Sequence, residues 1–262
     1  MPNFAANLTM MFNEYEFLDR FKAASQSGFK GVEFLFPYDY DKQEILENLK
    51  SNNLKQVLHD LPAGNWDNGD RGNACQPDRV GEFQDGVGLT IEYATVLECS
   101  NVTCLAGIPE NNTNPEDLKN TFIDNLTFAA NELKKHDIKL LIEPINTIDI
   151  PGFYLTNTNQ ALSIINEVNS DNIALQYDIY HMQIMEGDLT RTIHENIESI
   201  AHFQLADNPG RNEPGTGEIN YPFIFDVIDK SNYKGWIGCE YKPLSHTEDG
   251  LDWVRKHLTG SN

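Results

Sequence analysis

Short runs of apolar and β-branched residues recur along the whole chain. Within each run the apolar residues are nearly continuous rather than alternating with polar ones, which is typical of parallel strands buried on both faces of a sheet. The pattern predicts eight strands, at residues 4–7, 31–36, 55–58, 101–105, 139–142, 173–177, 200–203 and 235–239.

Segments with helical spacing of apolar residues lie between these runs. One example carries Phe122, Leu126 and Ala129, and it begins at Asn114-Pro115, a capping residue followed by a proline suited to the first helical position. The spacing predicts helices at about residues 17–27, 42–51, 85–97, 115–135, 159–168, 189–197, 222–231 and 248–257.

Eight strands in strict alternation with eight helices predict an α/β fold, a closed (β/α)8 TIM barrel. A doubly wound open sheet satisfies the same alternation and is the structural alternative. No change of composition and no proline-rich linker divides the chain, so we expect residues 1–262 to form a single TIM-barrel domain.

Residues 61–78, rich in Gly and Asn, lack periodicity and are typical of a lid or binding loop; they contain Trp66 and Arg71.

The composition narrows the classes of partner. The 262 residues contain 19 Lys and Arg against 40 Asp and Glu, a formal net charge of −21, which disfavours nucleic acid because phosphates attract basic clusters. Solubility alone also explains an acidic surface. No apolar run reaches the roughly 20 residues that span a bilayer, and the N-terminus lacks the pattern of a secretory signal. We expect a cytoplasmic protein without nucleic-acid or membrane partners.

The four cysteines form no C-x-x-C pair, and they are too few for a disulfide framework in a chain of this length. Cys104 and Cys239 lie in predicted strands, where we expect buried reduced thiols.

Polar residues stand where the predicted strands end, at the side of a barrel that carries the chemistry in this fold. They are His59, Glu143, Asp178, Gln204 and Glu240, and Glu33 lies within the second strand. A helix cap or a surface ion pair explains any one of them. Barrel closure, however, would bring the last four together, and three converging carboxylates repel one another unless a cation lies between them.

A metal centre follows from this convergence. Glu143, Asp178, Gln204 and Glu240 offer only oxygen ligands, which suit a hard divalent ion such as Mg²⁺ or Mn²⁺. His181, three residues after Asp178, either orients a ligand or a substrate hydroxyl, or simply packs on the following loop.

Three stretches carry a resemblance to a known family: Gln176-Tyr177-Asp178-Ile179-Tyr180-His181, Gly217 to Pro222, and Gly235 to Pro243. With residues 4–8, 32–38, 61–66 and 71–72 they make the sequence similar to the hydroxypyruvate isomerases and the related 2-oxo-tetronate isomerases, among the xylose isomerase-like TIM barrels. The segment 205–209 departs from the family pattern, and we interpret this departure as bearing on substrate choice.

The resemblance implies an aldose–ketose type isomerase that interconverts hydroxypyruvate and tartronate semialdehyde by proton transfer through an enediolate. It implies Glu143 and Glu240 as the acid and base, and it implies that Asp178 and Gln204 join them around the divalent cation. The order in which the two glutamates act stays open.

The implied substrate is a small anionic hydroxy-oxo acid whose carboxylate needs a basic partner. The candidates are Arg71, Arg211 and Lys242, although for each residue taken singly a surface ion pair is the favoured explanation. His59 and His181 complete the predicted substrate contacts. A homo-oligomer is compatible with the sequence, and no feature marks its interface.

Other functions fit parts of the pattern. A 2-oxo-tetronate isomerase uses a four-carbon acid, and a ketose epimerase or isomerase on the same scaffold uses a neutral sugar. A metal-dependent endonuclease would ordinarily need His-rich sites and a basic groove, and neither is evident in the sequence. A non-catalytic protein that binds a sugar or a metal is the alternative from another functional class.

Overall fold

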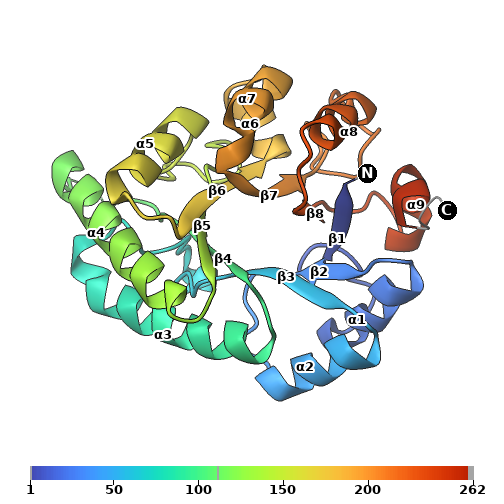
Figure 1. The fold of residues 1–262 in the computed structure, drawn as a ribbon, viewed down its shortest axis with the longest axis horizontal. Helices are drawn as coiled ribbons and strands as arrows, with labels where there is room; N and C mark the ends of the chain where they lie inside the picture. The colour runs from blue at the N-terminus through green and yellow to red at the C-terminus, as the bar shows by residue number, and fades with distance from the viewer. Residues whose placement is uncertain (1, 111, 259–262) are drawn as a thin grey trace.

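A closed ring of eight parallel strands stands at the centre of the molecule, with helices around it (Figure 1). The computed structural model describes residues 2–110 and 112–258. The strands are β1 (Asn3–Asn7), β2 (Gly31–Glu33), β3 (Lys55–Asp60), β4 (Asn101–Cys104), β5 (Lys139–Ile142), β6 (Ile173–Asp178), β7 (Ile200–Leu205) and β8 (Trp236–Cys239).

Strand β1 closes the ring because it pairs with both β2 and β8. Ala5 lies opposite Gly31 on one side and opposite Gly238 on the other. An open sheet would leave two strands with a free edge, so the doubly wound alternative is excluded. The predicted closed (β/α)8 barrel is confirmed.

The helices follow the strands as the spacing predicts, with one addition and small shifts at the ends. They are α1 (Phe17–Gln26), α2 (Lys42–Ser51), α3 (Val80–Val96), α4 (Pro115–Lys134), α5 (Thr158–Val168), α6 (Ile179–Met185), α7 (Leu189–Asn196), α8 (Tyr221–Lys230) and α9 (Asp252–Leu258). Asn114 caps α4 by accepting a hydrogen bond from the backbone N–H of Glu116 at 2.9 Å, as its position before Pro115 predicts.

Helix α6 is the element that the sequence pattern does not predict. It starts immediately after β6, with no intervening loop, and Asp178 serves both as the last residue of the strand and as the cap of the helix. The Asp178 carboxylate accepts a hydrogen bond from the backbone N–H of Tyr180 at 2.8 Å. The expected helix at 248–257 is also divided, into a 3-10 turn at Thr247–Gly250 and α9.

The main core lies between the ring of strands and the helices, and a second, small cluster consists of strand residues. Its members are Ala5, Val57, Leu58, Leu141 and Ala174, with Trp236 packed against them. Trp236 also covers Gly31, where an added Cβ would come within 2.6 Å of the indole ring. The amino-terminal end of the barrel is therefore closed by apolar side chains, which leaves the other end for polar groups.

The long loop at residues 61–78 is fixed to the barrel rather than free. It contains two 3-10 turns, Trp66–Asn68 and Pro77–Arg79, and Gly72 forms a bridge to Ala106 just beyond β4. Gly72 has a φ of 102°, and a Cβ at this position would lie 2.2 Å from the Leu105 carbonyl oxygen. This close approach requires glycine.

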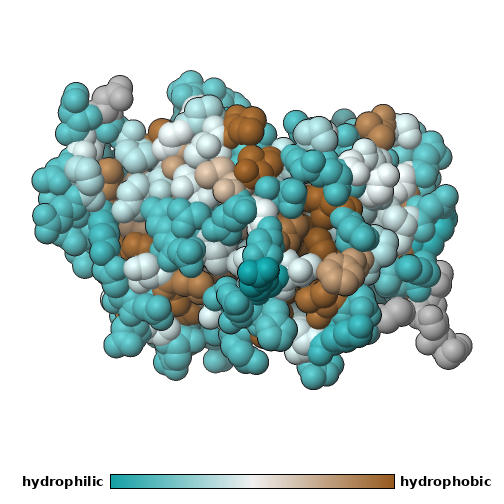
Figure 2. Space-filling model, turned by 90° about the horizontal axis from the view of Figure 1, so that it is seen from above, coloured by the Kyte–Doolittle hydropathy of each residue, from teal (hydrophilic) through white to brown (hydrophobic). Residues whose placement is uncertain are grey.

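Hydrophilic residues occupy most of the surface seen in Figure 2, and apolar residues show between them in separate groups. Within residues 2–110 and 112–258, no helix is long and apolar enough to cross a membrane.

Replacing Gly72 by Ala tests how the long loop is held. We expect the Gly72→Ala variant to lose about 2 kcal/mol or more in free energy of unfolding, because it combines backbone strain with a collision against Leu105. Gly69→Ala is the matched control, since Gly69 has a φ of 98° and no atom within 4 Å of an added Cβ. Urea denaturation of both variants measures the difference, and equal losses would contradict the anchoring at Gly72.

Candidate active site and metal centre

Buried polar side chains gather where the strands end. Seven residues at or next to the carboxyl ends of the strands are each at most 7% exposed: Asn7, Glu33, Asp60, Glu143, Asp178, Gln204 and Glu240. Five of these seven side chains are carboxylates. Burying a carboxylate is costly unless hydrogen bonds or a cation compensate for the lost hydration, so five buried together need an explanation.

The centre of this group consists of Glu143, Asp178 and His181. One potential ligand atom from each lies within 4.8 Å of the others. His181 Nε2 is 3.8 Å from Glu143 Oε1 and 3.5 Å from Asp178 Oδ2. Both of these carboxylate oxygens are buried without a hydrogen-bond partner. Two unpartnered oxygens facing the same point fit a divalent cation, which would replace the lost hydration of both.

Asn146 determines which nitrogen of His181 carries the proton. The Asn146 carbonyl oxygen accepts hydrogen bonds from the backbone N–H groups of Ile148 and Asp149, so its amide nitrogen must face the imidazole. That nitrogen lies 2.6 Å from His181 Nδ1, which therefore accepts and leaves the proton on Nε2. His181 thus presents an N–H donor, not a metal-ligating lone pair, to the centre.

Asp178 divides its two oxygens between the fold and the centre. Oδ1 accepts the hydrogen bond from the Tyr180 N–H that begins α6, and Oδ2 points towards Glu143 and His181. The helix therefore holds the carboxylate so that a single oxygen is available to a ligand.

Burial and mutual repulsion disfavour negative charge in this centre. Burial, together with the charges of Glu240 and Asp178, raises the pKa of Glu143 well above its usual value. Burial also raises the pKa of Asp178 to about 6 and that of Glu240 to about 7, although the Arg211 charge opposes both shifts. Burial, with the Arg211 charge, lowers the pKa of His181 well below its usual range, which agrees with a neutral imidazole.

Gln204 and Glu240 lie beside this centre and are held by hydrogen bonds. Gln204 accepts from the Gln176 amide at 2.6 Å and donates to Glu33 at 2.8 Å. Glu240 Oε2 accepts from Arg211 Nη2 at 2.6 Å, and Glu240 Oε1 lies 3.5 Å from Asn7 Nδ2. The structure brings Glu143 and Asp178 together with His181, and the four-residue ligand set stays a prediction for Gln204 and Glu240.

Arg211 is the one of the three candidate basic residues that contacts a site carboxylate. Besides Glu240, it lies 3.4 Å from Asp149, and its guanidinium stands over the Tyr180 ring at 5.2 Å. Arg71 instead stacks on Trp66 at 4.0 Å and donates to the backbone carbonyls of Trp66 and Asp70. The Lys242 side chain is exposed at the outer rim.

His59 and its neighbour Asp60 face opposite sides of β3, as successive strand residues do. The His59 ring packs against Tyr38 and lies 3.1 Å from the Gln56 amide, and burial lowers its pKa to about 3. Asp60 ends the strand instead. Asp60 lies opposite Thr103 in the sheet, and the Thr103 hydroxyl donates to Gln176, the partner of Gln204, so Asp60 faces the site side. Burial and the charges of Glu240 and Glu33 raise the pKa of its carboxyl. Sequence reasoning named His59 and missed Asp60 by one position.

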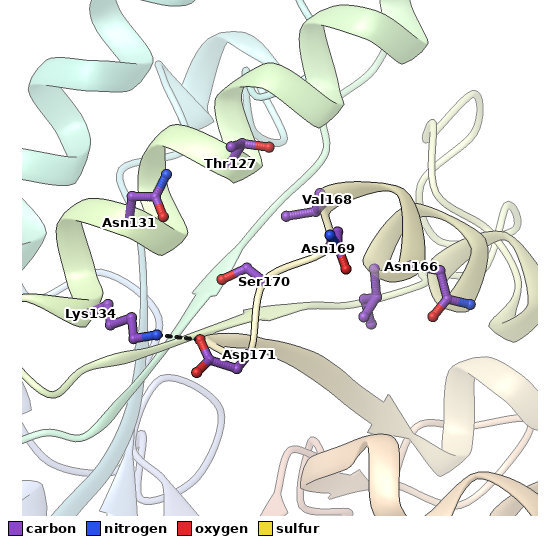
Figure 3. A pocket seen from close by; sticks show the side chains of 9 residues that line it. Thr127, Asn131, Lys134, Asn166, Val168, Asn169, Ser170 and Asp171 are labelled. Carbon is purple, nitrogen blue, oxygen red and sulfur yellow. Dashed lines mark hydrogen bonds and ion pairs between the residues drawn. The ribbon is translucent and has the colours of Figure 1, made fainter.

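The two cavities of largest volume among those found in residues 2–110 and 112–258 lie outside the carboxylate group. One of about 800 Å³ is formed by the loops after β1, β2 and β3, at the same end of the barrel, and Phe36, Tyr38 and Trp66 are among its walls. The other, of about 660 Å³, lies between the carboxyl ends of α4 and α5, where Lys134 pairs with Asp171 at 2.5 Å (Figure 3). Helix ends precede strand starts, so this second cavity is at the opposite end from the site.

Comparison with known proteins identifies the family of this chain. The family model described as xylose isomerase-like TIM barrel matches residues 21–257. The chain belongs to this family. It is 55% identical to hydroxypyruvate isomerase of Escherichia coli strain K12 over 254 residues, which cover 97% of this chain and 98% of the relative. The predicted resemblance is thereby confirmed, and relatives that match over almost the full length are named isomerases.

Two further similar proteins carry other names than hydroxypyruvate isomerase. The chain is 43% identical to 2-oxo-tetronate isomerase of Cupriavidus necator, covering 98% of this chain and 99% of the relative. A crystal structure named as an AP endonuclease of family 2 from Brucella melitensis superposes with a TM-score of 0.95 at 46% identity, covering 97% of this chain and 98% of that one.

The raised carboxyl pKa values make a prediction for stability. A group whose pKa is higher in the folded than in the unfolded state stabilises the protein below its unfolded pKa, and this contribution is lost as the pH rises through the folded pKa. For Asp178 and Glu240 that window runs from about pH 4 to about pH 7. We expect the melting temperature of the chelator-treated protein to fall between pH 5 and pH 8, and Mn²⁺ to restore it at pH 8.

The Asp178→Asn variant should show a smaller fall in melting temperature between pH 5 and pH 8. Asp226→Asn, a change in an exposed ion pair with Lys230, should leave that fall unchanged. The loss in the wild type is on the order of a few kcal/mol. Thermal scans across the pH series measure it, and a metal-free protein whose stability is flat between pH 5 and pH 8 would contradict the assigned cause.

Proposed function

We propose that this protein interconverts hydroxypyruvate and tartronate semialdehyde with a divalent cation, Mg²⁺ or Mn²⁺, at the carboxyl end of the barrel. The observation that carries the proposal is the pair of unpartnered, buried oxygens of Glu143 and Asp178 beside a neutral His181. The 55% identity to a hydroxypyruvate isomerase over 97% of the chain supports the choice of reaction.

The reaction moves hydrogen between adjacent carbons of the substrate. One proton leaves C3 and one is delivered to C2, while the hydroxyl proton on O3 is lost and O2 gains one, so the ketone becomes an alcohol and the alcohol an aldehyde. Glu143, Asp178, Gln204 and Glu240 would hold the cation. When bound, the cation polarises the substrate carbonyl and stabilises the negative charge that develops on the oxygens.

Glu143 and Glu240 are the two carboxylates that we assign to proton transfer at carbon. They extend from β5 and β8, on different sides of the ring, so one can remove the proton from C3 while the other delivers to C2. Burial raises the pKa of both, so each binds a proton more readily than an ordinary glutamate does. His181, with its proton on Nε2, is placed to donate a hydrogen bond to a substrate oxygen.

Arg211 is the basic residue that we assign to the substrate carboxylate. Its ion pairs with Glu240 and Asp149 fix the guanidinium beside the site, and the remaining N–H groups on its edge can donate to an anion at this position. It also opposes the negative charge of the surrounding carboxylates, which would otherwise repel an anionic substrate.

A four-carbon 2-oxo-tetronate is the second candidate substrate. The 43% identity to a 2-oxo-tetronate isomerase over 98% of the chain supports this candidate. A neutral ketose would make no use of Arg211. The net charge of −21 argues against a nucleic-acid substrate, although the 46% identical structure bears the name of an endonuclease.

An isomerase assay with and without chelator tests the proposal. We expect turnover of hydroxypyruvate that is abolished by chelator and restored by Mg²⁺ or Mn²⁺, with 2-oxo-tetronate as the comparison substrate. Glu143→Gln and Glu240→Gln should each lower kcat by at least about 10²-fold, because neither amide can transfer the proton. Glu132→Gln, in an exposed pair with Lys135, is the control and should keep full activity. Near-wild-type turnover in either site variant would refute its role.

Arg211→Gln tests recognition of the substrate carboxylate. We expect a KM for hydroxypyruvate that rises by about 10-fold or more, in line with the loss of a charge-assisted hydrogen bond. Dihydroxyacetone has a hydroxymethyl group where hydroxypyruvate has its carboxylate, so the KM for dihydroxyacetone should change much less. Arg71→Gln and Lys242→Gln serve as matched controls, and a selective KM effect in either one instead of Arg211 would reassign the carboxylate partner.

A further inference from the structure

Glu33, the last residue of β2, is a buried carboxylate to which the proposed reaction gives no role. It is 1% exposed, and three side chains donate hydrogen bonds to it. Asn7 Nδ2 and Gln204 Nε2 reach Oε1 at 3.0 and 2.8 Å, and His202 Nε2 reaches Oε2 at 2.7 Å. Strands β1 and β7 are therefore both tied to one acceptor inside the ring.

This acceptor sets the direction of a chain of buried amides. A carboxylate can only accept, so Gln204 must turn its NH₂ group to Glu33 and its carbonyl oxygen away from it. The Gln176 NH₂ group then donates to that oxygen at 2.6 Å, and the Gln176 oxygen accepts from the Thr103 hydroxyl. Each amide in the chain has a single orientation that satisfies its neighbours.

Strand β8 leaves space for the Glu33 carboxylate. Gly238 lies opposite Gln204 in the sheet, and an added Cβ at Gly238 would come within 2.2 Å of both Glu33 carboxylate oxygens. A side chain of any size would push the carboxylate aside. The glycine two residues before Glu240 is thus explained by Glu33.

The same network reaches two of the predicted ligands. Gln204 lies opposite Asp178 in the sheet, and Asn7 Nδ2 contacts Glu33 at 3.0 Å and Glu240 Oε1 at 3.5 Å. A carbonyl oxygen has two lone pairs, so the Gln204 oxygen that accepts from Gln176 keeps one for a cation.

We propose that Glu33 is a positioning residue that orients the Gln204 amide so that its carbonyl oxygen is presented to the divalent cation, and that it steadies Glu240 through Asn7. This inference rests on the proposed function, since it needs the cation that the proposed function places there. Groups that orient a ligand commonly alter metal affinity by about 10- to 100-fold when removed.

Binding of Mn²⁺ to the protein without substrate tests the proposal. We expect Glu33→Met, which keeps the volume but cannot accept the three donors, to weaken Mn²⁺ binding by about 10- to 100-fold. Glu33→Gln should bind within about 3-fold of wild type, because its amide oxygen still accepts from Gln204, and its NH₂ group can donate to His202 once the imidazole proton moves to the unpartnered Nδ1. Calorimetric titration of the purified variants gives the Kd values.

Gly238→Ala perturbs the same carboxylate without changing its chemistry, and it should weaken Mn²⁺ binding as Glu33→Met does. In a Gln204→Ala background, Glu33→Met should add less than about 3-fold, because the larger part of its effect runs through Gln204 and only the smaller part through Asn7. Wild-type Mn²⁺ affinity in a folded Glu33→Met or Gly238→Ala protein would overturn the inference. So would full additivity with Gln204→Ala.

Gly238→Ala also covers the case in which Glu33→Met does not fold, because it displaces the Glu33 carboxylate while leaving every hydrogen-bonding group of the network in place. Hydroxypyruvate turnover by the wild type is measured separately, so loss of the proposed reaction with intact Mn²⁺ binding would refute the function and leave the role of Glu33 standing.

Discussion

The burial of carboxylates at one end of a closed barrel is the constraint on which the site depends. Glu143, Asp178 and Glu240 are held where water is largely excluded, and the charges of Asp178 and Glu240 raise the pKa of Glu143. The fold tolerates this cost because the strands and their helices fix the side chains from the outside. The cluster therefore favours binding of positive charge. Arg211 neutralises part of its negative charge, and a divalent cation would neutralise more of it.

The site is also layered along the barrel. Apolar side chains close the amino-terminal end, where Trp236 covers Gly31. Above them lies the network around Glu33, whose donors come from the first and seventh strands, and above that network lie the carboxylates. Each layer orients the next one, so the position of a ligand oxygen is determined by hydrogen bonds that no single strand provides.

Much of the fold could be predicted from the sequence because nearly continuous apolar runs and helical spacing alternate along the chain. Helix α6 escaped prediction because Asp178 ends a strand and caps a helix at once, with no polar loop between. Asp60 was missed because the side that a strand residue faces changes with a shift of one position. The contact between Arg211 and Glu240 could not be predicted because it depends on the path of the loop after β7, where Arg211 takes the left-handed φ of 54°.

Closure of the ring between β1 and β8 ties the completion of the site to the order of synthesis. The first strand emerges from the ribosome early, and its second edge stays unpaired until residues 236–239 have been made. Asn7 and Glu240, 233 positions apart in the chain, come within 3.5 Å only through that last pairing. The full acidic cluster therefore requires the β1–β8 pairing that closes the barrel, and a chain that stops before β8 lacks Glu240 and never carries all of these charges in one cavity.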